Sequence, residues 1–141
     1  MSYETIWEKK GIYWKYKGIM TGDDLLQSNM SIYGDSRFDK LRYQLIDMLD
    51  VESFDVDTEA MEEITAMDVG ASQTNPRLIV AVVATHIQAK RFVELYKTTT
   101  GRAPWETEIF ESVAEARVWI TSKFGIAFES TMCPADLLPE N

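Results

Sequence analysis

Cysteine and histidine are scarce in this chain of 141 residues, which contains one of each, Cys133 and His86. A single cysteine excludes an internal disulfide bond and a zinc site built from cysteines, and it favours a reducing, cytoplasmic setting. Long apolar runs are also missing, because the longest, residues 78–84, is far shorter than the roughly 20 residues of a membrane-spanning helix. The N-terminal sequence MSYETIWEKK lacks a basic region followed by an apolar block, so we expect no signal peptide.

Basic residues are missing from one long segment of the chain. The net charge is −9, from 23 acidic and 14 basic residues. Between Asp47 and Pro76 there is no lysine or arginine, and nine acids occur there: Asp47, Asp50, Glu52, Asp55, Asp57, Glu59, Glu62, Glu63 and Asp68. The other 14 acids balance the 14 bases, so this segment holds the whole net charge. Nucleic-acid-binding proteins usually carry the opposite charge, so we expect no nucleic-acid partner, and attraction to anionic lipid is disfavoured.

Alternating and continuous apolar patterns predict five strands, at residues 4–8, 12–17, 41–48, 78–84 and 105–110. The first two are short, close together and separated by Lys9-Lys10-Gly11, which favours a hairpin, and Gly18 marks a break after the second. Residues 78–84 (LIVAVVA) show no polar alternation and therefore predict a central strand with both faces covered.

Capping motifs and apolar stripes predict four helices. Capping boxes begin at Thr21, Thr85 and Ser112, and glycines at 34 and 125 mark helix ends. Between residues 49 and 57 we expect an acidic loop, followed by a helix. The expected buried faces are Leu26, Met30 and Tyr33; Ala60, Ile64, Met67 and Ala71; Ala89, Phe92, Val93 and Tyr96; and Val113, Ala116, Ile120 and Phe124.

The predicted order is β-β-α-β-α-β-α-β-α, an α/β fold. Each β-α-β step requires a parallel pair of strands with a right-handed crossover, and the hairpin adds one antiparallel strand. We predict one domain at residues 1–125 and a C-terminal tail at residues 126–141, in which residues 135–138 pack on the domain or on a partner.

Several short phrases resemble one known family. They are residues 18–24 with Thr-Gly-Asp at a helix start, the Asp47 that closes a strand, Asn75-Pro76 before an apolar strand, and the ending at residues 110–119. With residues 54–60, they resemble the STAS domain of sulfate transporters and anti-sigma factor antagonists, and in particular its SpoIIAA-like (STAS/SEC14-like) branch, over about residues 4–122. The resemblance implies stacked βα units with near-sequential strand order, and a regulatory or ligand-binding module rather than an enzyme.

In the anti-sigma factor antagonists, a serine at the start of the second helix is phosphorylated, within a Phe-x-Asp-Ser-Ser-Gly context. The matching positions here are Thr58, Glu59 and Ala60, so the acceptor position falls near a glutamate and Thr58 is the remaining possible phospho-acceptor. A structural interpretation is favoured over this one: Asp57 or Thr58 caps the helix, and the acids stabilise its positive end.

Catalytic and metal-binding signals are weak. Thr85 and His86 follow the central strand, but no serine, cysteine or aspartate nearby completes a catalytic set, so a role of His86 in a helix cap is favoured. Cys133 lies in the predicted tail. The acids do not match a calcium-binding loop, and there is no glycine-rich phosphate loop, so we predict no metal and no cofactor.

The sequence thus favours a non-enzymatic, STAS-like module. Its partner is a protein, or a second copy of the chain, at an acidic edge, or else an apolar small molecule or lipid beside residues 78–84. The predicted edge comprises Asp50, Glu52, Asp55, Asp57, Glu59, Glu62 and Glu63. One alternative is a small enzyme of unknown reaction, built from Thr21, Asp23, Asp50, Thr58, Thr85, His86 and Ser112. Another is a peripheral membrane protein, which the lipid-binding connection of the SEC14-like label implies.

Overall fold

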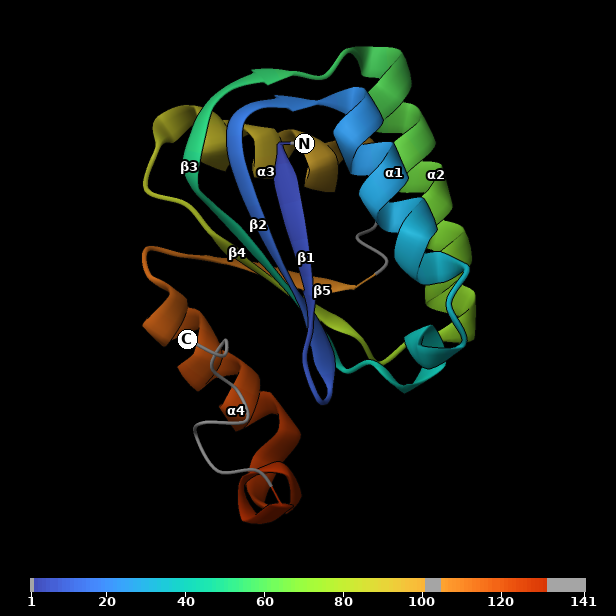
Figure 1. Ribbon diagram of the computed structural model, residues 1–141, viewed down its shortest axis with the longest axis vertical. Coiled ribbons are helices and arrows are strands. Elements are labelled where there is room, and N and C mark those ends of the chain that lie inside the picture. Colours follow the sequence, from blue (N-terminus) through green and yellow to red (C-terminus); the bar gives the residue numbers. More distant parts are fainter. Residues whose placement is uncertain (1, 101–104, 132–141) are drawn as a thin grey trace.

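A computed structural model describes residues 2–100 and 105–131, which form one five-stranded sheet with the strand order β1-β2-β3-β4-β5 (Figure 1). The strands are β1 (Tyr3–Trp7), β2 (Gly11–Thr21), β3 (Tyr43–Asp55), β4 (Ile79–Val83) and β5 (Glu106–Phe110). β1 and β2 pair antiparallel, and every later pair is parallel. The predicted hairpin, the parallel βα units and the sequential strand order are therefore confirmed.

Helices cover both faces of the sheet (Figure 1). α1 (Gly22–Tyr33), α2 (Thr58–Thr74) and α3 (Ile87–Thr100) lie on one face, and α4 (Val113–Thr131) lies on the other. A 3-10 helix, η1 (Ser36–Lys40), replaces the polar loop predicted before β3. All five residues of β4 are buried, as predicted for a central strand, and α4 is the apolar cover of its second face.

Two strands are longer than predicted. β2 continues through Gly18, which adopts a φ of 68° between two register shifts, so the predicted break is a bulge. Pairing then resumes and ends at Thr21 opposite Asp55. The predicted acidic loop is consequently wrong over most of its length. Val51 is buried and Phe54 half-buried against the core, and this burial holds the extension of β3 in place.

The predicted buried faces of α1 and α2 are wrong in part. Met30 is 62% exposed, and α1 instead buries Leu25, Ser28, Asn29 and Ile32. α2 buries Met61, Ile64, Thr65 and Asp68. Apolar periodicity misplaced these faces because each helix turns polar side chains inward, where they bond to groups distant in sequence.

α4 continues through Gly125 to Thr131, so the predicted helix end at this glycine is wrong. Glycine is tolerated inside a helix at a cost of roughly 1 kcal/mol relative to alanine. Residues 126–131 of the predicted tail are therefore helical. The remainder of that tail, including Cys133 and residues 135–138, lies outside the described residues.

Candidate functional site

The predicted acidic edge lies where β3 runs past its neighbour and enters α2. β4 pairs with β3 only as far as Asp47 opposite Val83, whereas β3 extends to Asp55. All seven predicted edge residues are exposed: Asp50, Glu52 and Asp55 on the β3 extension, then Asp57, Glu59, Glu62 and Glu63 around the first turns of α2. None of the seven takes part in an ion pair within the described part of the chain. The end of β3 and the start of α2 thus both present exposed acids, and we call these seven residues the acidic edge.

Asp57 caps α2, because its Oδ1 accepts a hydrogen bond from the Ala60 backbone N–H at 2.8 Å. Thr58 is the first residue of the helix and is exposed. Of the two capping candidates, Asp57 is therefore the one used. The Thr58 hydroxyl lies at the solvent, flanked in sequence by Asp57 and Glu59.

An open groove borders the acidic edge on the β2–β3 ribbon. Its lining includes Lys17, Ile19, Leu49 and Asp50. Ile19 is 56% exposed and Leu49 is 43% exposed. Lys17 is the partner of Asp50 in the β2–β3 ladder, so one base lies at the margin of the acids. The edge therefore combines strong negative charge with two exposed aliphatic side chains.

Three of the residues proposed for a catalytic site serve as helix caps. Thr21 Oγ1 accepts from the Asp24 N–H at 3.1 Å, and Ser112 Oγ accepts from the Glu115 N–H at 3.1 Å. His86 Nδ1 accepts from the Gln88 N–H at 3.2 Å. The cap role favoured for His86 is thus seen, and the predicted capping box at Thr85 is wrong, because the next residue takes its place.

Thr85 is exposed, as is His86.

Within residues 2–100 and 105–131, no three histidine, cysteine, aspartate or glutamate side chains are grouped so as to hold a metal ion. In the same residues, no helix has both the length and the apolarity needed to cross a bilayer.

Two acids of the predicted acidic segment are not at its surface. Asp47 is 4% exposed and Asp68 is 6% exposed, and they lie on opposite faces of the sheet. On the α4 face, Tyr13 donates a hydrogen bond to Asp47 Oδ2 at 2.8 Å. Burial, followed by this bond to the carboxylate, raises the pKa of Tyr13.

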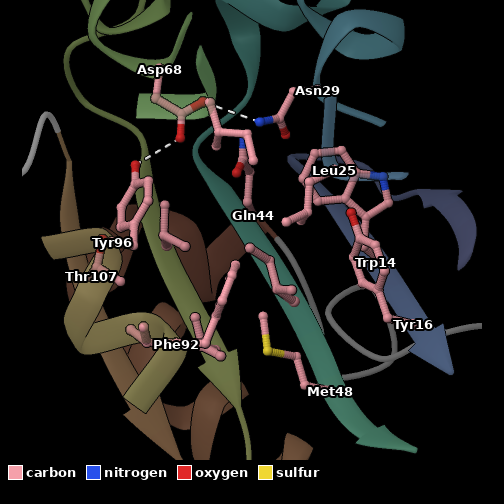
Figure 2. Close-up of a pocket in the computed structure, with 15 residues that line it drawn as sticks. Trp14, Tyr16, Leu25, Asn29, Gln44, Met48, Asp68, Phe92, Tyr96 and Thr107 are labelled. Carbon is pink, nitrogen blue, oxygen red and sulfur yellow. Dashed lines mark hydrogen bonds between the residues drawn. The ribbon is translucent and has the colours of Figure 1, made fainter. Parts of the chain in front are cut away.

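Asp68 is the centre of a buried polar cluster on the other face (Figure 2). Its Oδ1 accepts from Tyr33 Oη at 2.5 Å and from Asn29 Nδ2 at 3.3 Å, and its Oδ2 accepts from Tyr96 Oη at 2.7 Å. Burial raises the pKa of Asp68 to about 6, although the hydrogen bonds from the two tyrosines oppose the shift. Burial, and then the charge of Asp68, raises the pKa values of Tyr33 and Tyr96.

A cavity of about 60 Å³ adjoins this cluster, between the sheet and the layer of α1, α2 and α3 (Figure 2). Its polar end contains Asn29, Gln44 and Asp68. The rest of its wall is mainly apolar and aromatic: Trp14, Tyr16, Leu25, Ile46, Met48, Ile64, Val80, Val82, Phe92 and Val93, with Tyr96 and Thr107. A mainly apolar cavity with a few convergent polar groups and a carboxyl of raised pKa has the character of a ligand site.

The sequence left open an apolar ligand beside residues 78–84, and Val80 and Val82 of that run line this cavity, but the buried polar cluster was not predicted. Asp68 was counted with the solvated acids because carboxylates are rarely buried without a charged partner. One signal was present, since Asp68 follows Ile64 by four residues and therefore shares its face of α2. The hydrogen-bond donors to Asp68 are 28 to 39 residues away along the chain, so no local motif records them.

Comparison with known proteins shows the fold. The chain is similar to a DUF3478-family protein with a SpoIIAA-like fold from Shewanella loihica, with a TM-score of 0.57 and 15% identity over 84% of this chain and 92% of that one. It is also similar to the anti-sigma factor antagonist SpoIIAA in its unphosphorylated form, with a TM-score of 0.53 and 8% identity over 88% and 99% of the two chains. The phosphorylated form of the Bacillus cell fate determinant SpoIIAA gives a TM-score of 0.51 and 11% identity over 84% and 99%. No family model and no curated protein matches the sequence. The SpoIIAA-like fold that the sequence phrases implied is therefore present.

Proposed function

We propose that the protein is a non-enzymatic regulatory module that recognises a basic surface of a partner protein through the acidic edge. The observation that carries the proposal is the set of seven exposed carboxylates on the β3 extension and the start of α2. None of them is paired within the described residues, so their field is available to a partner of opposite charge.

Two further features support a protein partner. Ile19 and Leu49 provide exposed apolar area beside the acids, and a protein interface combines such area with a polar rim. The fold is that of SpoIIAA, which is an anti-sigma factor antagonist and therefore acts on other proteins. Phosphorylation of Thr58 remains a prediction.

The test is capture of a partner from an extract of the source cells by the immobilised protein, with bound proteins identified by mass spectrometry. We expect the triple variant Glu59→Lys, Glu62→Lys and Glu63→Lys to lose the partner that the wild type captures. The matched control reverses three exposed acids elsewhere, Glu4, Asp39 and Glu108, which produces the same change of net charge. Equal capture by the wild type and the first triple variant would show that the acidic edge is not the binding surface.

A further inference from the structure

β1 is an end strand of the sheet, with β2 on one side of it (Figure 1). Two backbone hydrogen bonds fix which of its residues face β2. At one end the Lys17 N–H donates to the Ser2 carbonyl oxygen, and at the other the Glu8 N–H donates to the Gly11 carbonyl oxygen, both at 2.8 Å. In an antiparallel ladder every second residue bonds to a given neighbour, so the even-numbered residues of this segment face β2. The odd-numbered residues of β1 therefore direct their N–H and C=O groups to the open side.

The open edge of β1 lacks the features that commonly keep sheet edges apart, which are lysine, proline and bulges. Its sequence, YETIW, contains no lysine or proline, its register with β2 is unbroken, and its one charged residue, Glu4, has Lys15 as its cross-strand neighbour.

The other end strand, β5, carries two exposed acids, Glu106 and Glu108. Two-fold pairing of β5 about its middle residue would set Glu108 against Glu108 of a second copy. Like charges directly opposite each other destabilise a strand pair. Of the two end strands, β1 is therefore the one suited to pairing with itself.

We propose that two copies of the chain associate through their β1 strands, which pair antiparallel about a two-fold axis at Thr5. Tyr3 then lies opposite Trp7 of the second copy, and Thr5 lies opposite Thr5 of the second copy. Because the outward-facing residues are opposite one another, each such pair exchanges two backbone hydrogen bonds, about six in all. The two sheets join into one continuous sheet.

The side chains of β1 fit this register. Tyr3 and Trp7 both pack on the face of the sheet that α1, α2 and α3 cover, so the new pairs bring an aromatic ring of each copy together. Cross-strand aromatic pairs stabilise a sheet. Ile6 packs on the opposite face, and there it meets Glu4 of the second copy, so no like charges lie directly opposite each other.

The charges at the two ends of β1 are complementary in an antiparallel pair. Asp24 lies beside the start of the strand, where it accepts a hydrogen bond from the Ser2 hydroxyl. Lys9 and Lys10 are exposed in the turn that follows its other end. Antiparallel pairing brings the lysines of each copy to the end where the other copy has Asp24. This surface is separate from the acidic edge on β3 and α2, so self-association does not depend on the proposed partner.

Sedimentation velocity of the full chain, from micromolar to millimolar concentration at fixed salt, tests the proposal, and we expect a monomer–dimer equilibrium. Thr5→Pro removes the outward N–H and leaves the bonds to β2, so the dissociation constant should rise at least roughly tenfold, as loss of the two central hydrogen bonds implies. Thr5→Val is the matched control. It also loses the hydroxyl that accepts from Trp14 Nε1 at 3.0 Å, but it keeps the N–H and should dimerise like the wild type. A chain that stays monomeric, with β1 left to a strand of another protein, overturns the proposal, as does equal dimerisation of a folded Thr5→Pro variant.

Cross-linking tests the register, and it decides the question if Thr5→Pro does not fold. In a Cys133→Ser background, Thr5→Cys should form a disulfide-linked dimer on mild oxidation. The Cα atoms of directly opposite, hydrogen-bonded residues are about 5.5 Å apart, which a disulfide can span. Glu108→Cys, at the middle of β5, is the control and should remain monomeric. No cross-link at Thr5→Cys, or equal cross-linking of the two variants, refutes the β1 interface.

Discussion

Both faces of the sheet bury carboxylates, and two of them, Glu8 on the α4 face and Asp68 on the other, are satisfied in different ways. On the α4 face, Glu8 forms a two-pronged ion pair with Arg117, with nitrogen–oxygen distances of 2.9 and 2.7 Å, and also accepts a hydrogen bond from Tyr43. On the opposite face, Asp68 accepts hydrogen bonds from neutral groups alone, those of Asn29, Tyr33 and Tyr96.

The ion-paired Glu8 has the character of a structural charge, whereas Asp68 has the character of a charge at a functional site. The side chains of Arg117 and Glu8 are 4% and 5% exposed, and they join α4 to the β1–β2 hairpin across 109 residues of sequence. Asp68 has no opposite charge to offset its desolvation, so its pKa rises to about 6, and it borders the cavity together with Gln44. Buried carboxylates with raised pKa values cluster at functional sites, whereas paired ones commonly hold elements together.

Breaking the paired site should produce the largest effect. Arg117→Met leaves Glu8 buried without its counter-charge, and we expect the free energy of unfolding in urea to fall by about 3–5 kcal/mol. Lys123→Met is the matched control, because it breaks the 2.8 Å pair with Glu106, whose side chains are 38% and 48% exposed. That change should cost less than about 1 kcal/mol.

A double variant tests whether the loss comes from the stranded charge. Adding Glu8→Leu to Arg117→Met removes the uncompensated carboxylate and should restore part of the stability. A double variant that is no more stable than Arg117→Met alone would show that the packing of Arg117, rather than its charge, holds α4.

The unpaired site should instead show itself in the dependence of stability on pH. The pKa of Asp68 is raised from 3.8 to about 6 in the folded protein, so the folded state holds the proton more tightly than the unfolded state. The free energy of unfolding must therefore fall as the pH rises from about 4 to about 6. At about 1.4 kcal/mol per pKa unit, the fall attributable to Asp68 is about 3 kcal/mol, of which about half remains between pH 5 and 7.

Asp68→Asn isolates the contribution of Asp68 to the pH dependence of stability, because the amide can keep hydrogen bonds to the tyrosines and does not titrate. We expect urea unfolding of the variant at pH 5, 6 and 7 to lack the portion of the slope that Asp68 contributes, while the other acids affect both proteins alike. Parallel stability profiles would mean that Asp68 does not bind a proton in this range and that the contrast between the two faces is wrong.

The fold was predictable from the sequence because its signals are local. Alternation marked β2 and β5, a continuous apolar run marked β4, and the caps at Thr21 and Ser112 use bonds that span three residues. The residues of the acidic edge were also predictable, because these acids lie close together in the sequence. Its β3 part, however, was expected to be a loop. The sequence predicted a loop there, whereas burial of Val51 and Phe54 on the inner side favours a strand.

The polar end of the cavity was not predictable because it depends on side chains from separate elements. Gln44 comes from β3, Asp68 from α2 and Tyr96 from α3. Apolar periodicity places polar residues outward by default, so a polar cluster on an inner face reverses its prediction, as the exposure of Met30 beside the burial of Asn29 illustrates. The arrangement becomes visible only when α2 and α3 are placed on one face of the sheet that contains β3.

A third carboxylate, Asp57, shows how much of the contrast depends on burial. Like Asp68 it accepts hydrogen bonds only from neutral groups within the described residues, here the Ala60 N–H, but it is exposed. In Asp57→Ala, water can accept the hydrogen bond of the Ala60 N–H in place of the carboxylate. The expected loss of unfolding free energy is therefore about 1 kcal/mol, the usual value of an N-terminal cap. Thr58→Ala alters the next residue without removing the cap and should change stability by less than half as much. Equal losses in the two variants, measured by urea unfolding at pH 7, would show that Asp57 is not the cap of α2.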